Sequence, residues 1–139
     1  MEIKNRKARF NYFIEKTYEA GIVLSGTEIK SVRKGSANFN DSYISINGNE
    51  AFIKNMYIAK YEEGNRFNHD ERRDRKLLLH RNEIKRLQNE VQTVGYTIVP
   101  VRLYFKGNYA KIEIGLAKGK KLYDKRESIK KRDLDREMR

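Results

Sequence analysis

The sequence predicts a mainly β fold with α-helices, in which antiparallel strands form a small barrel flanked by two to three helices. Two observations carry this prediction. Several runs alternate between apolar and polar residues and end at tight-turn sequences, which is typical of antiparallel hairpins. Two other segments show a helical cap or apolar residues at helical spacing. The 139 residues fit one domain, which we expect to span residues 1–117, followed by a basic tail at 118–139.

The N-terminal part begins with a strand region and a capped helix. Residues 10–24 read as a strand region with an interruption near Lys16-Thr17. Ser25 is placed to cap a helix whose third residue is Glu28, and such a capping box satisfies two backbone N–H groups that a helix start leaves free. The helix is expected to end at Gly35, because glycine readily adopts the left-handed conformation that follows many helices.

A hairpin and a loop follow. Residues 43–46 and 51–54 flank Asn47-Gly48, a strong tight-turn signal, and residues 57–59 add a short strand. Residues 61–74 are rich in charge, glycine and asparagine but poor in apolar residues. We therefore expect a long mobile loop there.

A second helix and a second hairpin complete the predicted barrel. Apolar residues recur on one helical face from Ile84 to Val94. Residues 96–105 then alternate, with the odd-numbered positions on one face, and residues 110–116 alternate after a turn, so we expect a hairpin with one buried face. Pro100 lacks an N–H group, which predicts an edge or bulge position.

Charge is the strongest functional signal in the sequence. The chain carries 31 lysine and arginine residues against 19 acidic residues, a formal net charge of +12. Such a surplus on a small domain indicates a polyanionic partner, most commonly a nucleic acid, because neutralised phosphates release counterions. An acidic membrane surface is the alternative polyanion. No apolar stretch approaches the length that spans a bilayer, and we expect no membrane partner.

The tail differs in composition from the predicted barrel. Residues 118–139 contain ten basic and five acidic residues, and their apolar residues form no clean helical stripe. We expect this tail to be disordered when free and helical when bound to RNA.

An enzymatic site lacks its usual residues. The chain has no cysteine and two histidines, so a nucleophile–base–carboxylate triad has few options. His69-Asp70 is too small a set for a metal site, and His69 is expected to be an exposed loop residue. Residues 115–121 lack the spacing of a phosphate-cradling loop, although their lysines suit phosphate contact. We expect no enzyme activity, no cofactor and no metal.

The predicted nucleic-acid face combines basic residues with a few tyrosines. Tyr12, like Tyr43, Tyr57 and Tyr123, is a candidate for base stacking, whereas most other aromatic residues are expected in the core. The basic members of this face are Arg6, Lys7, Lys30, Arg33, Arg75 and Lys76, with Lys118, Lys120 and Lys121 at the start of the tail.

Five motifs in fixed order cover nearly the whole chain. The first motif comprises residues 5–8 and 12–15, and the second comprises 18–24 and 26–31. The third and fourth are 41–43 and 75–80, and the fifth is 115–121 together with 124–126. On these motifs the chain resembles the SsrA-binding protein family (small protein B), which partners transfer-messenger RNA (tmRNA) in bacterial ribosome rescue. The resemblance implies an oligonucleotide-binding-like (OB-like) barrel that recognises the tRNA-like domain of tmRNA.

The resemblance also implies a place on the ribosome. The tail is expected to enter the decoding region of the small subunit and to become helical in the vacant mRNA channel. The barrel is expected to help deliver alanylated tmRNA, with elongation factor Tu, to stalled ribosomes for trans-translation in the bacterial cytoplasm. Family members usually extend beyond the position of Arg139, and without such an extension we expect RNA binding to persist while rescue fails.

Individual residues carry roles implied by the resemblance. Glu19 matches a glutamate important for RNA binding, either as an acceptor for base or sugar donors or through a structural bond that orders the RNA-facing loop. Leu77 and His80 match a segment of the same surface, although Leu77 fits a buried strand equally well. The residues matching the tail segment near the decoding centre are Asp124, Lys125 and Arg126, with the adjacent Tyr123.

Two rival functions compete with this interpretation. A structural ribosomal protein fits a small basic barrel with basic ends equally well on physical grounds. An RNA-processing hydrolase is the enzymatic rival, and the sequence offers it no carboxylate–histidine cluster.

Overall fold

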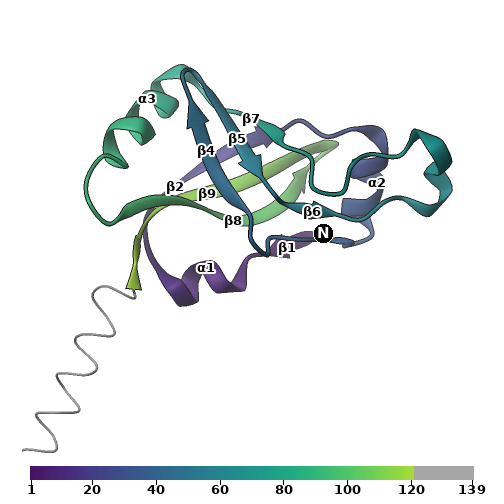
Figure 1. The fold of residues 1–139 in the computed structure, drawn as a ribbon, viewed down its shortest axis with the longest axis horizontal. Coiled ribbons are helices and arrows are strands. Elements are labelled where there is room, and N and C mark those ends of the chain that lie inside the picture. The colour runs from purple at the N-terminus through teal and green to yellow at the C-terminus, as the bar shows by residue number, and fades with distance from the viewer. Residues whose placement is uncertain (121–139) are drawn as a thin grey trace, which may run out of the picture.

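Antiparallel strands dominate the fold (Figure 1). The computed structural model describes residues 1–120, and for residues 64–66 it describes the backbone alone. In chain order the elements are β1 (Glu2–Lys4), α1 (Arg6–Asn11), β2 (Tyr12–Ile22), α2 (Gly26–Arg33), β3 (Ala37–Asn38), β4 (Tyr43–Asn47), β5 (Glu50–Lys54), β6 (Tyr57–Ile58), the 3-10 helix η1 (Glu62–Phe67), β7 (Arg75–Leu78), α3 (Arg81–Glu90), β8 (Tyr96–Lys106) and β9 (Tyr109–Gly119).

The main sheet has seven strands in the order β1-β8-β9-β2-β7-β5-β4, and β3 pairs with β6 in a second small sheet. The main sheet curves so that its edge strand β4 lies against β8, but within the described residues β5 is the only strand paired with β4. The architecture is therefore a partly open barrel. The predicted mainly β fold with helices is confirmed, and the sheet stays unclosed because no ladder joins β4 to β8 in this part of the chain.

The C-terminal hairpin is confirmed as β8 and β9, and its bulge changes which side chains are buried. The register shifts between Pro100 and Arg102, which confirms the predicted bulge at the proline. Leu103 lies in the main core, whereas Val99 packs outside the barrel with Ala8 and Ala117. The prediction that the odd-numbered positions share one buried face was therefore wrong, because the bulge moves the side chains before it to the opposite face.

Helix α1 was missed in the sequence. It covers the outer surface of the sheet, where Ala8 packs against Val99 and Ala117. Asn5 holds its start by donating a side-chain hydrogen bond to the carbonyl oxygen of Pro100, at 2.7 Å. Six residues with one buried side chain carry no helical periodicity, so the pattern contained no signal for this helix.

The two predicted helices are confirmed with different ends. Ser25 and Glu28 form the complete capping box of α2. In α3, Ile84 and Leu87 are buried, but the helix ends at Glu90 and Val94 is 89% exposed. The prediction that Val94 continues the buried face was wrong, because the chain has left the helix before it reaches that position.

Residues 61–74 contain more order than a loop prediction implies. They include η1, and the side chain of Asn68 hydrogen-bonds both backbone groups of Tyr61, at 2.9 and 2.5 Å. His69 is buried, with its ring nitrogens 2.9 Å from the Thr27 hydroxyl and 2.9 Å from the Ile58 carbonyl oxygen. The prediction of an exposed His69 was wrong, while the mobility of the loop stays a prediction.

Strand β9 continues to Gly119, two residues beyond the boundary expected between barrel and tail. The remaining residues of the expected tail, 121–139, lie outside the described part of the chain, and so does its predicted change from disorder to helix. Among residues 1–120, no helix combines the length and apolar character needed to cross a membrane.

Candidate nucleic-acid interface

Strands β2, β9, β8 and β1 present one continuous polar surface on the outside of the barrel. Cross-strand pairing places Glu19, Glu113, Arg102 and Lys4 in one row, and Gly21, Lys111, Tyr104 and Glu2 in the next. The alternate residues Ala20, Ile112 and Leu103 point into the core. We call this surface the outer sheet face, and its polar members are Glu2, Lys4, Glu19, Arg102, Tyr104, Lys106, Lys111 and Glu113.

Every carboxylate of the outer sheet face is paired. Arg102 forms ion pairs with Glu113 at 3.1 Å and with Glu2 at 3.6 Å. Glu19 accepts hydrogen bonds from the Tyr104 hydroxyl and from the Lys106 ammonium, the latter at 3.2 and 3.3 Å. Because the negative charges are compensated locally, this surface can approach an RNA backbone without unpaired repulsion.

The pKa values in this network follow from the hydrogen bonds. The pKa of Glu19 lies below its usual value because the Tyr104 hydroxyl and the Lys106 ammonium stabilise the carboxylate. Burial and the hydrogen bond to Glu19 raise the pKa of Tyr104 to about 12. Tyr104 therefore stays protonated throughout the physiological range and donates a hydrogen bond to the Glu19 carboxylate. The structural bonds of Glu19 run to strand β8 rather than to a loop, and acceptance from an RNA donor remains an expected role.

Apolar side chains border the outer sheet face at the β7 end. Leu78 is 56% exposed, and Val23 and Tyr109 are also exposed. With Gly21 and Lys111 they line a shallow pocket of about 260 Å³. An added Cβ at Gly21 would stand 3.2 Å from the Cβ of Leu78, a tight contact that would require a small shift of the neighbouring strand. Exposed apolar side chains beside cations suit contact with unstacked RNA bases.

Two residues predicted to bind RNA are instead inside the protein. Arg75 is 0% exposed and Leu77 is 1% exposed. Strand alternation in β7 explains both positions, since Arg75 and Leu77 point inward while Lys76 and Leu78 point outward. Arg75 is therefore removed from the RNA-binding set, and the core alternative for Leu77 is confirmed.

Arg75 has a structural partner. Its Nε lies 2.5 Å from Oε2 of Glu28, which is also fully buried, and it donates hydrogen bonds to the carbonyl oxygens of Met56 and Glu71. Burial works against the charge of Glu28. Hydrogen bonds from Arg73, the Ser25 N–H and Arg75 nevertheless outweigh it and hold the pKa of Glu28 below its usual value. This network ties α2, β7 and the segment after β5 together.

Some of the other predicted residues lie at opposite ends of β8. Arg33 lies over Phe105 at 4.3 Å and Lys30 lies 5.4 Å from the Tyr61 ring, near the end of β8. Lys120 lies over Phe13 at 4.9 Å, near the beginning of β8. Arg6 lies between these two ends, where it lines a pocket with Arg102 and Glu113 of the outer sheet face. The exposed predicted residues are Arg6, Lys7, Glu19, Lys30, Arg33, Lys76 and His80, and the partly buried ones are Tyr12, Lys118 and Lys120.

The separation between these two ends is substantial. Val99, which contacts α1, and Phe105 are six residues apart on one strand, which corresponds to roughly 20 Å. The structure therefore leaves Arg33 and Lys120 far apart, while Arg6 lies between them beside the outer sheet face. The predicted tail residues Lys121, Tyr123, Asp124, Lys125 and Arg126 lie outside the described residues.

Several interface residues were missed in the sequence. Leu78, Arg102, Tyr104, Lys106 and Lys111 share one outer surface because strand pairing brings them together. The alternation from Arg75 to Leu78 contained a signal for Leu78. The alternation predicted for residues 96–105 already directed Arg102 and Tyr104 away from the buried face, because the bulge reverses only the side chains before it.

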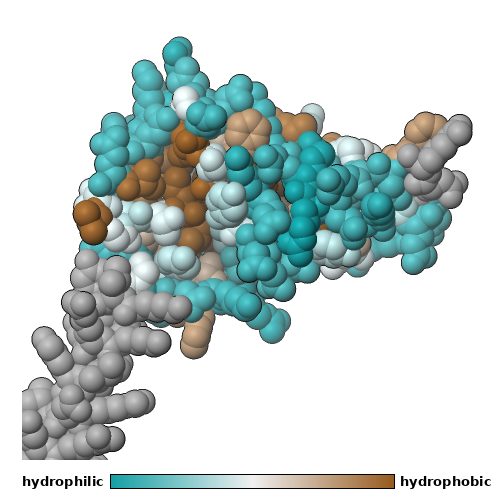
Figure 2. All heavy atoms as spheres, in the orientation of Figure 1, coloured by the Kyte–Doolittle hydropathy of each residue, from teal (hydrophilic) through white to brown (hydrophobic). Residues whose placement is uncertain are grey.

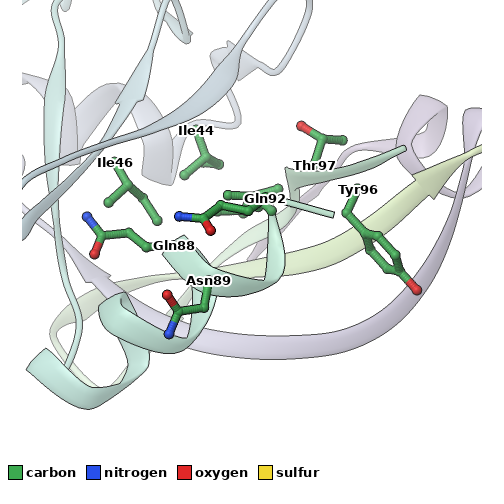
Figure 3. A pocket seen from close by; sticks show the side chains of 9 residues that line it. Ile44, Ile46, Gln88, Asn89, Gln92, Tyr96 and Thr97 are labelled. Carbon is green, nitrogen blue, oxygen red and sulfur yellow. The ribbon is translucent and has the colours of Figure 1, made fainter. Parts of the chain in front are cut away.

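An uncharged groove lies on another side of the barrel, between α3 and β4 (Figure 3). It has a volume of about 470 Å³, and Figure 2 shows apolar residues gathered in this hollow. Its lining residues are Ile44, Ile46, Gln88, Asn89, Val91, Gln92, Tyr96, Thr97 and Ile98. Because no lining residue is charged, the groove is a poorer candidate for phosphate contact than the outer sheet face. Within residues 1–120 there is no group of three or more histidine or acidic side chains that could hold a metal ion.

Comparisons with known proteins place the chain in a family. The family model described as SmpB protein matches residues 2–139. The SsrA-binding protein of Staphylococcus saprophyticus is 59% identical over 98% of this chain and 91% of its own length. That of Geobacillus thermodenitrificans is 56% identical, over 97% and 87%. A chain in a solved structure described as "tmRNA-SmpB: a journey to the center of the bacterial ribosome" is 48% identical, with a TM-score of 0.73 over 86% of this chain and 84% of that one. The chain with this outer sheet face therefore belongs to the SmpB protein family.

Proposed function

We propose that this protein binds tmRNA through its tRNA-like domain and helps deliver it to stalled ribosomes for trans-translation. The observation that carries the proposal is the outer sheet face, where cations, a tyrosine and an exposed apolar border lie side by side in a member of the SmpB family. The name of the relatives, SsrA-binding protein, and the tmRNA-SmpB ribosome complex support the same partners.

The composition of the outer sheet face suits a folded RNA better than a regular duplex. RNA helices are read through phosphates and 2′-hydroxyl groups, while unstacked bases in loops are read by apolar and aromatic surfaces. Lys111 and Lys4 supply phosphate contacts, and Leu78 and Tyr109 supply an apolar surface. A tRNA-like elbow, which combines helices with exposed loop bases, offers both kinds of contact.

The finer steps form the rest of the proposal. The segment from Tyr123 to Arg126 contacts the decoding region of the small ribosomal subunit, and the tail enters the mRNA channel and becomes helical there. Elongation factor Tu meets this protein indirectly, through the alanylated tmRNA. The protein acts by binding and shape rather than by catalysis, and it works in the cytoplasm.

A gel-shift experiment tests the proposal. The full chain is titrated against tmRNA and against an elongator tRNA of similar charge, at several salt concentrations. We expect a preference for tmRNA and an affinity that falls steeply with salt, because binding releases counterions. Equal affinity for both RNAs, or a flat salt dependence, would count against it.

Variants of exposed aliphatic residues locate the interface. Leu78→Ala, at the border of the outer sheet face, is expected to weaken tmRNA binding. Val94→Ala, also exposed but beyond the end of α3, is expected to leave it unchanged. Affinity purification from bacterial lysate separates the ribosomal alternative. Selective recovery of tmRNA supports rescue, while stoichiometric recovery with every ribosome supports a structural ribosomal protein.

A further inference from the structure

The carboxylate of Glu19 is held in place from two directions. A carboxylate offers about four acceptor positions. The Tyr104 hydroxyl occupies one on Oε2, and the Lys106 ammonium contacts Oε1 and Oε2 at 3.3 and 3.2 Å. About one position on Oε1 therefore stays open to a further donor. The Glu19 side chain is 39% exposed, so a donor from solvent or from a bound molecule can reach it.

Tyr104 is itself fixed. The guanidinium of Arg102 lies over its ring at 4.1 Å, and Arg102 is anchored by Glu113 and Glu2. One face of the Tyr104 ring is thereby covered, which makes the residue a poor platform for base stacking from that side. Its hydroxyl is directed at Glu19, so the ring acts as a rigid support for the carboxylate.

We propose that Tyr104 is a positioning residue for RNA recognition. With Lys106 it locks the Glu19 carboxylate in one orientation, so that the open acceptor position receives a hydrogen bond from a base N–H or a ribose hydroxyl of the bound RNA. This inference rests on the proposed binding of tmRNA. It gives the bond between Tyr104 and Glu19 a role in binding, since that bond orients the acceptor.

Locking the carboxylate matters because hydrogen bonds to ions are sensitive to geometry. A charge-assisted bond is about twice as strong as a neutral one when donor and acceptor are aligned. A freely rotating glutamate on an exposed strand would lose side-chain freedom on binding, whereas Tyr104 and Lys106 have already restricted Glu19. Removing the Tyr104 hydroxyl therefore weakens RNA binding only while Glu19 is present.

A double-mutant cycle tests this dependence. The affinity of the full chain for the tRNA-like part of tmRNA is measured for wild type, Tyr104→Phe, Glu19→Ala and the double variant. We expect Tyr104→Phe to weaken binding by about tenfold, as for a lost hydrogen bond to a charged group. In the Glu19→Ala background the same substitution is expected to change affinity by less than about twofold.

The chain contains a matched control. Tyr96 also lies on β8, and its hydroxyl donates a hydrogen bond to the Glu15 carboxylate at 3.0 Å. The ammonium of Lys118 lies over its ring at 4.8 Å. Tyr96→Phe removes the same atom from the same kind of contact, and we expect affinity within about twofold of wild type. Circular dichroism of each variant verifies that the fold is retained.

The pH dependence separates positioning from a general structural effect. The groups facing Glu19 are Tyr104 and Lys106 from β8 and Lys111 and Glu113 from β9. Without the Tyr104 hydroxyl, the lowered pKa of Glu19 returns toward its usual value. The loss of affinity on acidification should then begin at higher pH in Tyr104→Phe than in wild type. In a Glu19→Gln background this loss of affinity should be absent, with or without Tyr104→Phe.

The outcomes are distinct. If Tyr104→Phe binds as tightly as wild type, or weakens binding equally with and without Glu19, the positioning role is overturned while tmRNA binding stands. If wild type shows no preference for the tRNA-like part of tmRNA over an elongator tRNA, the proposed function fails and this inference fails with it.

Discussion

The buried Glu28–Arg75 pair predicts a large effect of a single substitution on stability. Arg75→Met keeps an unbranched side chain of similar length but removes the charge. In wild type the guanidinium donates to Glu28 and to the carbonyl oxygens of Met56, Asp70 and Glu71. The substitution leaves Glu28 with Arg73 and the Ser25 N–H as donors, and leaves the carbonyl oxygens without this donor.

The magnitude follows from the burial of both partners. Removing one partner of a buried ion pair costs about 3–5 kcal/mol, because the other charge stays buried without full compensation. For a chain of this size, each kcal/mol lowers the melting temperature by roughly 4 °C, so we expect a decrease of roughly 12–20 °C. Replacing both partners removes the uncompensated charge, so Glu28→Gln with Arg75→Met should be more stable than Arg75→Met alone.

Urea and thermal unfolding, followed by circular dichroism, measure these differences. The matched control is Lys76→Met, the next residue in β7, whose ion pair with Glu50 spans 3.7 Å between exposed side chains. Surface pairs of this kind contribute less than about 1 kcal/mol. If the free energies of unfolding of Arg75→Met and Lys76→Met differ by less than about 1 kcal/mol, Arg75 is not a major stabilising contact of this region and the reasoning is refuted.

Three further predictions concern acid, packing and the tail. Hydrogen bonds lower the pKa of Glu28, so the Glu28 carboxylate contributes to stability above its usual pKa. This contribution is lost as pH falls through the lowered pKa. The Glu28→Gln variant should therefore lose less stability than wild type during acid unfolding. Gly115→Ala places a Cβ 2.7 Å from Cγ2 of Ile14, so urea unfolding should show a loss of about 1–3 kcal/mol, whereas Gly26→Ala, with no atom within 4 Å, should be neutral or stabilising. Replacing Asp124, Lys125 and Arg126 by alanine should preserve tmRNA affinity in gel shifts but abolish peptide tagging on stalled ribosomes; loss of RNA affinity would contradict this separation of roles.

Local patterns predicted much of the fold. The Ser25–Glu28 capping box, the two hairpins and the bulge at Pro100 are confirmed, because each depends on neighbouring residues that determine backbone conformation directly. The errors arose where a pattern was extended past its physical limit. Val94 has the right spacing for the α3 face, but the helix ends before it.

The candidate interface was harder to predict than the fold. Basic residues could be counted in the sequence, but Arg75 shows that an arginine in a charged segment can be fully buried when a glutamate far along the chain meets it. His69 was misjudged for the same reason, since its partners Thr27 and Ile58 come from other elements. Contacts of this kind depend on residues that only folding brings together.

By itself the sequence determined the charge of this protein, its alternation of strands and helices, and the motifs that indicate its family. These properties follow from composition and from short-range backbone preferences. The tertiary structure alone decided which charged residues face outward and which are paired inside. It brought Glu19 into hydrogen-bonding distance of Tyr104 and Lys106, which lie 85 and 87 residues after Glu19 in the chain. The physical reason is that strand register and the Pro100 bulge, rather than local sequence, determine which side chains share a face of the sheet.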